Sequence, residues 1–386
     1  MKKTRVLDMV QKYTMILVLV LVVLFFYFRT NHKLLMPQNI TNIISQNAYV
    51  FVLATGMLLC ILTGGNIDLS VGSVVCFTGA IGALILQKHL PMGLAIAAML
   101  LVGLAIGCWQ AFWIAYVRIP PFITTLSGML VFRGLSNVIL KGQTVSLTNK
   151  TFIRIFGGGA DCYIGTGQFA KTLCVIVAIA AAAAFVVLTL LSRLTRQKKG
   201  YKVDSLVGYI IKTVLIAAVI LFFGYKLSKY KGLPTVLIWV ALVIGIYSYI
   251  TSKTTIGRHF YAVGGNEKAT KLSGINTNRV YFLAYANMGL LAGLAGMLTI
   301  ARLTSSQPTY GQSYEMDAIG SCFIGGASAY GGIGTVPGVI VGALLMGVIN
   351  IGMSIMGVDQ NWQKVVKGLV LLAAVIFDVV TKKKNS

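Results

Sequence analysis

The sequence contains very little charge for its length. Only 11% of its 386 residues are Asp, Glu, Lys or Arg, against about 25% in a typical soluble chain. A helix of about 20 apolar residues crosses the ~30 Å hydrocarbon core of a bilayer. The low charge and the 57% of hydrophobic residues therefore exclude an ordinary soluble domain and predict an all-α, polytopic transmembrane bundle. Long stretches carry no charge at all: 34–67, 69–87, 90–117, 172–192 and 280–301.

Acidic residues are especially scarce, with 9 Asp plus Glu against 33 Lys plus Arg and a net charge of +24. In a soluble chain this balance would suggest nucleic-acid binding. Here basic residues gather in short segments between apolar runs, which is typical of cytoplasmic loops that contact anionic lipid headgroups. We therefore expect contact with membrane lipid and no nucleic acid. The basic segments are 2–5, 193–202, 253–279 and 382–384, while Lys226, Lys229 and Lys231 depart from this rule in a segment expected outside.

Arrangements of residues that support catalysis are missing as well. The six cysteines and three histidines show no ligand spacing, so neither a disulfide framework nor a metal site is predicted. There is no G-x-x-x-x-G-K-[ST] segment, and Gly332 and Gly334 follow no strand-like run and precede Pro337. The sequence predicts no cofactor and no enzyme, and any ATP hydrolysis belongs to a separate chain.

The apolar segments predict one transmembrane domain, 1–386, of about 10–12 spans. The first segment is followed by Arg29 and Lys33 without a small-residue cleavage site, so we interpret it as an uncleaved span and not as a signal peptide. Counting from a cytoplasmic N-terminus places 141–170 outside as a loop, 253–279 inside and the C-terminus inside; Cys162 falls in the outer loop. The expected spans are 15–28, 48–63, 70–86, 92–117, 122–140, 171–192, 207–224, 235–252, 280–301, 318–330, 337–356 and 363–380.

The first polar motif lies between two apolar segments. Gly64 and Gly65 can break a helix, and Asn66, Asp68 or Ser70 can accept hydrogen bonds from the N–H groups that begin the next one. An acid near membrane depth is costly and suggests function. Two interpretations of Asp68 are open, a helix cap or gate and a proton relay; the cap or gate is favoured because no second intramembrane acid lies nearby to receive a proton.

The second motif is the inner segment 253–279. Asn266 can begin a short helix that ends near Gly274, a common start and stop arrangement. This predicts a compact helix of about two turns on the cytoplasmic membrane face. The residues of interest in this segment are Gly257, Arg258, Gly264, Gly265, Asn266, Glu267, Ala269, Leu272, Ser273 and Gly274.

The third motif places Glu315 and Asp317 just before the expected segment 318–330. Acids at a helix start suit its positive dipole end. The glycine-rich stretch that follows predicts short or broken helices across 315–335, and 318–330 either spans the membrane or re-enters it. Further along, a tryptophan and two lysines have the composition of interfacial anchors: Trp362, Lys364 and Lys367.

Together these motifs resemble those of the inner-membrane permease subunits of bacterial ABC importers for ribose, galactose and xylose. The resemblance implies a partner ABC ATPase, a second permease copy and an extracytoplasmic sugar-binding protein. It also implies that 256–275 is the element that rests on the ATPase. The candidate residues for a gate or translocation pathway are Asn66, Asp68, Ser70, Glu315 and Asp317. The stretches that carry the resemblance are Asn66–Ser73, Pro121–Leu126, Tyr261–Ile275, Glu315–Gly326 and Gly331–Gly334.

The segment 193–252, an additional basic loop with two spans, is absent from the shorter ribose and galactose permeases. Its presence makes the chain most similar to xylose or multiple-monosaccharide permeases. A secondary, ion-coupled transporter is the main alternative, and it would require paired polar groups on broken helices near the midplane. A membrane enzyme is a weaker alternative, because no nucleophile–base or metal constellation is present.

Overall fold

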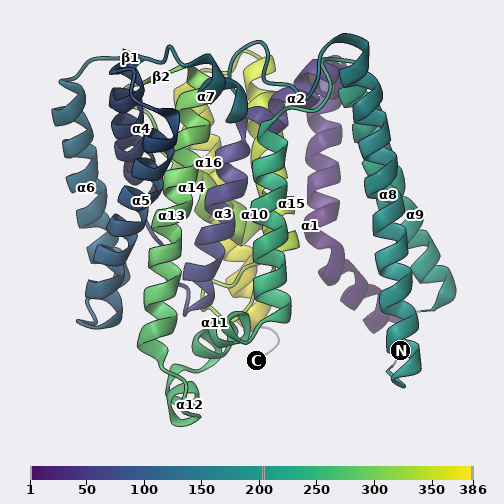
Figure 1. Cartoon of the computed structure of the whole chain (residues 1–386). Coiled ribbons are helices and arrows are strands. Elements are labelled where there is room, and N and C mark those ends of the chain that lie inside the picture. Colours follow the sequence, from purple (N-terminus) through teal and green to yellow (C-terminus); the bar gives the residue numbers. More distant parts are fainter. Residues whose placement is uncertain (1, 202, 204, 384–386) are drawn as a thin grey trace.

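A computed structural model describes the backbone of residues 2–201, 203 and 205–383, and the side chains between 15 and 379 except those of 202, 204 and 377. Lys202 and Lys384, which end two of the basic segments, lie outside the described residues. Most of the described chain is helical (Figure 1), as expected because lipid offers no hydrogen-bond partners to an open backbone. The elements are α1 (Lys2–Arg29), η1 (Lys33–Leu35), α2 (Pro37–Gln46), α3 (Ala48–Leu62), α4 (Val71–Gln87), α5 (Met92–Ala115), α6 (Pro121–Leu140), β1 (Val145–Ser146), α7 (Lys150–Ile155), α8 (Gly167–Lys198), α9 (Leu206–Ser228), α10 (Val236–Lys253), α11 (Thr255–Gly265), α12 (Glu267–Leu272), α13 (Thr277–Leu303), β2 (Ser305–Ser306), α14 (Tyr314–Ile324), α15 (Val336–Ile355) and α16 (Gln360–Lys383).

Seven helices in the described part of the chain are long and apolar enough to cross a membrane, or eight if α2 and α3, which meet at a 43° bend, form one span. They are α5, α6, α8, α9, α10, α13 and α15. Shorter apolar helices cover Met15–Arg29 and α4. The predicted polytopic all-α bundle is therefore confirmed, and the larger number of spans expected from the sequence includes helices that are short or bent.

Two ends of the bundle are distinct in Figure 1. At one end, which we name the α7 end, lie α2, α7 and the small antiparallel pair of β1 and β2. At the opposite end, named the α12 end, lie α11 and α12. The segments 141–170 and 253–279 are thus at opposite ends, as the sequence predicted. The segment 141–170 is more ordered than the expected loop, because it contains β1, α7 and the first turn of α8.

The centre of the bundle is α3, whose 15 residues are all buried. Beside it, α13 and α5 pack through two glycine pairs of the small-xxx-small type, Gly103 with Gly107 and Gly289 with Gly293. A Cβ on Gly289 would lie 2.2 Å from the carbonyl oxygen of Gly103, so any side chain there would force the helices apart. In a membrane, such close backbone approach supplies the packing energy that the hydrophobic effect supplies in water.

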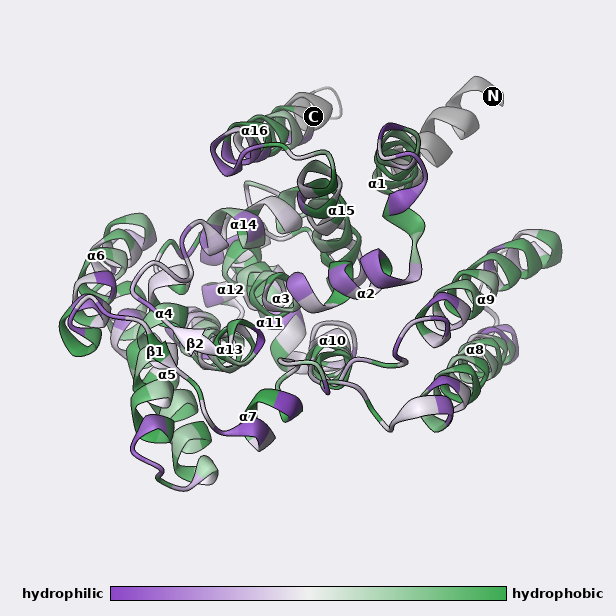
Figure 2. Ribbon diagram, turned by 90° about the horizontal axis from the view of Figure 1, so that it is seen from above, coloured by the Kyte–Doolittle hydropathy of each residue, from purple (hydrophilic) through white to green (hydrophobic). Residues whose placement is uncertain are grey.

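The α8–α9 hairpin stands to one side of the bundle (Figure 2). At the α7 end an antiparallel bridge between Tyr163 and Pro234 closes the base of the hairpin, and a small apolar cluster joins it to the rest of the bundle. That cluster consists of Ile40, Cys174, Leu227 and Leu233. Two of the predicted extra spans, 207–224 and 235–252, correspond to α9 and α10.

Candidate functional site

The segment between α3 and α4 folds back into the bundle. Leu62, at the end of α3, accepts a hydrogen bond from the Gly332 amide near α11. Gly64 and Gly65 then adopt positive φ values of 121° and 76°, a region that glycine enters without steric cost. The amide nitrogen of Asp68 lies 3.4 Å from the sulfur of Met57, so the chain runs back beside α3. As predicted, a broken segment surrounds Asp68, and α4 begins inside the bundle.

A buried polar network lies at this break. The Asp68 Oδ1 atom accepts hydrogen bonds from the Ser70 amide at 2.8 Å and the Ser70 hydroxyl at 2.6 Å. The Gln110 side-chain amide on α5 donates to the Ser70 hydroxyl at 2.8 Å. A Cβ on Gly128 of α6 would lie 2.4 Å from Gln110 Nε2, so this glycine lets α6 close over the network. Asn66 takes another partner, since its amide donates to Thr63.

Asp68 fixes the turn that leads into α4, but no side-chain hydrogen bond from the described residues caps the first turn of α4 itself. The cap or gate interpretation therefore stays a prediction. The Asp68 carboxylate accepts the N–H group of the residue that precedes α4, and buried polar groups of this kind need their partners because an unsatisfied one costs about 1–3 kcal/mol. The sequence analysis missed Gln110. The available signal was a lone amide side chain in the middle of the charge-free stretch 90–117.

We expect Asp68→Asn to keep most transport and Asp68→Leu to abolish it. An asparagine retains an oxygen that can accept from Ser70, whereas leucine leaves the Ser70 and Gln110 groups with fewer partners, at a cost of about 1–3 kcal/mol. The measurement is uptake by cells with matched membrane levels of each variant. Equal loss of uptake in both variants would show that an ionisable group is required, in favour of the proton-relay interpretation.

A second buried network surrounds Asp317 in the first turn of α14. The Tyr49 hydroxyl of α3 donates to Asp317 Oδ2 at 2.7 Å, and the Lys367 ammonium of α16 lies 2.9 Å from Oδ1. The Asp317 side chain is 2% exposed and that of Lys367 is 17% exposed. The Tyr314 ring stacks on that of Tyr49 with centroids 3.6 Å apart. An ion pair thus ties α14 to α16 inside the bundle.

Two predictions about this region need correction. Lys367 was interpreted as an interfacial anchor, but its ammonium group faces a buried carboxylate; Trp362 and Lys364 are exposed and fit the anchor interpretation. Helix α14 begins at Tyr314, four residues before the predicted 318, so Glu315 and Asp317 lie within the helix. The predicted breaks are confirmed, because α14 ends at Ile324 and α15 begins only at Val336.

Glu315 brings the first and third motifs together. A Cβ on Gly72 would lie 2.5 Å from Glu315 Oε2 and 2.1 Å from the Gly311 carbonyl oxygen. Arg133 on α6 donates to the carbonyl oxygens of Pro308 and Tyr310 in the same loop. The start of α4, the loop before α14 and α6 therefore meet at one point, where the region around Asp68 adjoins the region around Glu315.

The α12 end carries the predicted short helix, α12, and a second helix, α11, directly before it. The side chain of Asn266 accepts from the Ala269 amide at 3.0 Å and begins α12, and Gly274 follows its last turn with a φ of 82°. Asn266 is also the residue at which α11 ends. The start and stop residues predicted from the sequence are confirmed.

Some residues of α11 and α12 face the bundle, and others are exposed. Gly257 and Gly264 face the bundle: a Cβ on Gly264 would lie 1.8 Å from the Leu62 carbonyl oxygen. Leu272 points away from the bundle and is 89% exposed, more than any other large apolar side chain that the structure describes. The remaining predicted residues are exposed, apart from Glu267: Arg258, Gly265, Asn266, Ala269, Ser273 and Gly274.

Glu267 holds α12 against the bundle. Its carboxylate accepts from Arg118, in the loop after α5, at 2.8 Å and from the Tyr281 hydroxyl of α13 at 3.0 Å. Arg118 also donates to Asn278 and lies over the Tyr281 ring. Partial burial raises the pKa of Glu267, but the hydrogen bonds from Arg118 and Tyr281 outweigh it and leave that pKa below its usual range. The Glu267 carboxylate therefore stays charged at neutral pH and clamps α12 to Arg118. Sequence reasoning missed Arg118, which lies 149 residues from its partner.

The chain is similar in sequence to a family of transport permeases and to several of its members. A family model described as branched-chain amino acid transport system / permease component matches residues 39–203 and 175–375. The xylose transport system permease protein XylH of Haemophilus influenzae is 36% identical over 375 residues, 97% of each chain. The XylH of Escherichia coli K12 is 35% identical over 97% of this chain and 93% of its own length. The ribose import permease protein RbsC of Escherichia coli K12 is 34% identical over 88% of this chain and 85% of its own. No solved structure matches.

Proposed function

The chain belongs to the permease-component family of ABC transport systems, and on that premise we propose that it carries xylose or a related monosaccharide across the bacterial inner membrane. The observation that supports this substrate is full-length similarity to two xylose permeases, which extends over 97% of this chain. That length includes the α8–α9 hairpin. The similarity to a ribose permease covers 88% of this chain.

In the proposed importer, energy comes from a partner ABC ATPase that docks at the α12 end. The support is structural: α11 and α12 form a separate, well-capped element whose inner face is clamped by Arg118 and Glu267 and whose tip exposes Leu272. A rigid element with an exposed apolar tip suits a protein contact. Two permease copies would complete the membrane part, and an extracytoplasmic binding protein would deliver sugar at the α7 end.

This assignment places both termini and the α12 end in the cytoplasm. Exposed residues at the α7 end should therefore react with a membrane-impermeant thiol reagent in intact cells. Cys162, which the sequence placed in the outer loop, is buried and a poor reporter. We expect Gln168→Cys, at an exposed position, to be labelled in intact cells and Lys268→Cys, on α12, only after lysis. Labelling in the reverse order would overturn the orientation.

The choice of sugar belongs to the binding protein in this proposal. Recognition of a sugar needs many convergent hydrogen-bonding groups, whereas the polar groups around Asp68 and Asp317 bond with neighbouring side chains. The test is uptake of xylose, glucose, galactose and ribose by cells that contain this permease, its ATPase and its binding protein. Preference should follow the binding protein's affinities and move when a compatible binding protein is exchanged. Preference that persists after a functional exchange would assign selection to the permease.

A further inference from the structure

The α8–α9 hairpin has an unusually small area of contact with the rest of the protein. Only 6% of the apolar window of α9 and 17% of that of α8 are buried, against 78% for α13. Its apolar contacts with the body gather at the α7 end, around Leu227 and Leu233. Toward the α12 end the two helices therefore present apolar surface that must be covered by something other than this bundle.

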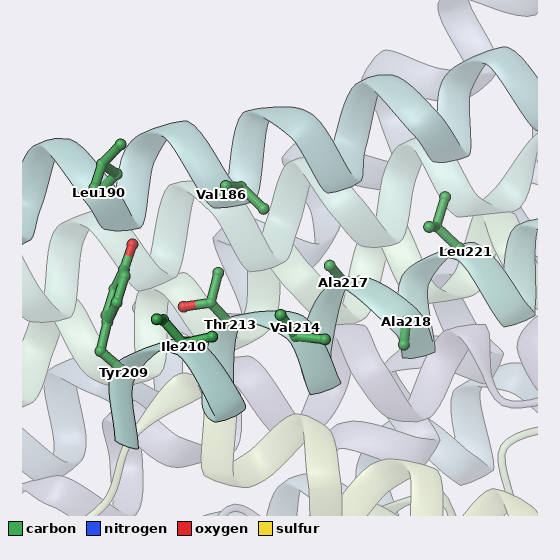
Figure 3. A pocket seen from close by; sticks show the side chains of 9 residues that line it. All are labelled: Val186, Leu190, Tyr209, Ile210, Thr213, Val214, Ala217, Ala218 and Leu221. Atoms are coloured by element: carbon green, nitrogen blue, oxygen red, sulfur yellow. The ribbon is translucent and has the colours of Figure 1, made fainter. Parts of the chain in front are cut away.

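A cavity of about 410 Å³ lies between the two helices in this less covered part. Figure 3 shows side chains from both helices around it. Ala217 and Ala218, in the middle of α9, have small side chains that leave this space open. Nearly all of the lining atoms are carbon. The lining also includes Leu190 on α8 and Tyr209 on α9.

Basic side chains lie beside the part of this cavity that is nearest to the α12 end. Arg193 follows Leu190 by three residues and so continues the same face of α8. Its guanidinium lies 4.9 Å from the centre of the Tyr209 ring, which lines the cavity. Arg196, Lys198 and Lys199 follow and are exposed. The acidic residue of this stretch, Asp204, lies outside the described residues.

We propose that this cavity holds an acyl chain of an anionic phospholipid whose phosphate is bound by Arg193 and Arg196. The apolar lining suits a hydrocarbon chain, and arginine presents forked donors that match phosphate oxygens. The basic residues supply the charge that selects an anionic headgroup over a zwitterionic one. The lipid would cover apolar surface of α8 and α9 that the bundle leaves open. Transport does not enter this inference, so its test is independent of the proposed function.

The test is native mass spectrometry of the full-length chain in detergent, titrated with phosphatidylglycerol or with phosphatidylcholine of the same acyl chains. We expect phosphatidylglycerol to bind at least tenfold more tightly. The double variant Arg193→Gln/Arg196→Gln should lose about 30-fold of that affinity, since each basic side chain near an anionic lipid contributes about fivefold. Ala217→Phe should fill the cavity and reduce binding of both lipids. The matched control is Lys226→Gln/Lys229→Gln, which removes the same charge at the other end of α9 and should bind like the unchanged protein.

Equal affinity for the two lipids, or equal losses in the arginine variant and the lysine control, would overturn the proposal. A second copy of the chain is the competing occupant, and Ala218→Cys with a short bis-maleimide distinguishes it. Efficient cross-linking between copies would place another protein surface at the cavity and contradict a lipid there. Because the arginine variant leaves the apolar lining of the cavity unchanged, it keeps the test decisive even if Ala217→Phe does not fold.

Discussion

Lys367→Met should sharply reduce the amount of folded permease in the membrane. The substitution removes the cation that faces Asp317, a carboxylate that is 2% exposed, and leaves Tyr49 as its hydrogen-bond donor. Removing one partner of a buried ion pair costs about 3–5 kcal/mol, because the other charge stays buried without compensation. A loss of that size is a large fraction of a typical unfolding free energy of about 5–15 kcal/mol.

The second substitution that tests this explanation is Asp317→Asn in the Lys367→Met background. The amide is neutral and can still accept from Tyr49, so the membrane level and thermal stability of the double variant should recover. Lys364→Met, at an exposed position on α16, is the control and should behave like the unchanged protein. No recovery in the double variant would show that the charge of Lys367 is required for another reason. Recovered stability without uptake would assign the pair to the transport pathway.

Leu272→Asp should reduce ATP-driven uptake at least tenfold while the permease stays folded. Leu272 is 89% exposed at the tip of α12 and contributes little to internal packing, so the substitution acts on what docks there. A hot-spot residue at the centre of an interface contributes about 2 kcal/mol or more, and burying a new carboxylate there adds to the loss.

The measurement combines uptake with co-purification of the ATPase. Tyr201→Asp is the control, since Tyr201 is also a large exposed side chain, 65% exposed, on the hairpin, away from α12. The control should retain both uptake and the ATPase, whereas Leu272→Asp should lose both. Normal uptake and normal ATPase recovery in Leu272→Asp would remove α12 from the coupling contact.

Local sequence signals predicted the α12 end well. The start of α12 at Asn266 and its stop near Gly274 depend on side-chain and backbone preferences of single residues, which a sequence displays directly. Apolar runs likewise predicted the long helices, because the bilayer thickness sets their length. The segment 141–170 was predicted less well: its polarity suggested a loop, although its short elements contact the bundle, as in the pairing of Val145 with Ser306.

Partnerships across the bundle were not predictable from the sequence. Asp317 meets Lys367 across 50 residues and Tyr49 across 268. No single-chain pattern identifies such partners, and for this reason Lys367 was interpreted as an anchor. The start of α14 was placed too late because Glu315 and Asp317 were treated as residues outside a span, whereas a charged residue can enter a membrane helix when it has a partner inside the protein.

The most direct test of the central claim is reconstitution. The permease and the proposed partner ATPase are reconstituted in proteoliposomes that enclose ATP, the proposed sugar-binding protein is added, and entry of labelled xylose is measured. We expect xylose to accumulate against its gradient only when ATP, the ATPase and the binding protein are all present. Dissipating ion gradients should leave this accumulation unchanged. Accumulation driven by an ion gradient without ATP or the ATPase would contradict this expectation and identify a secondary transporter.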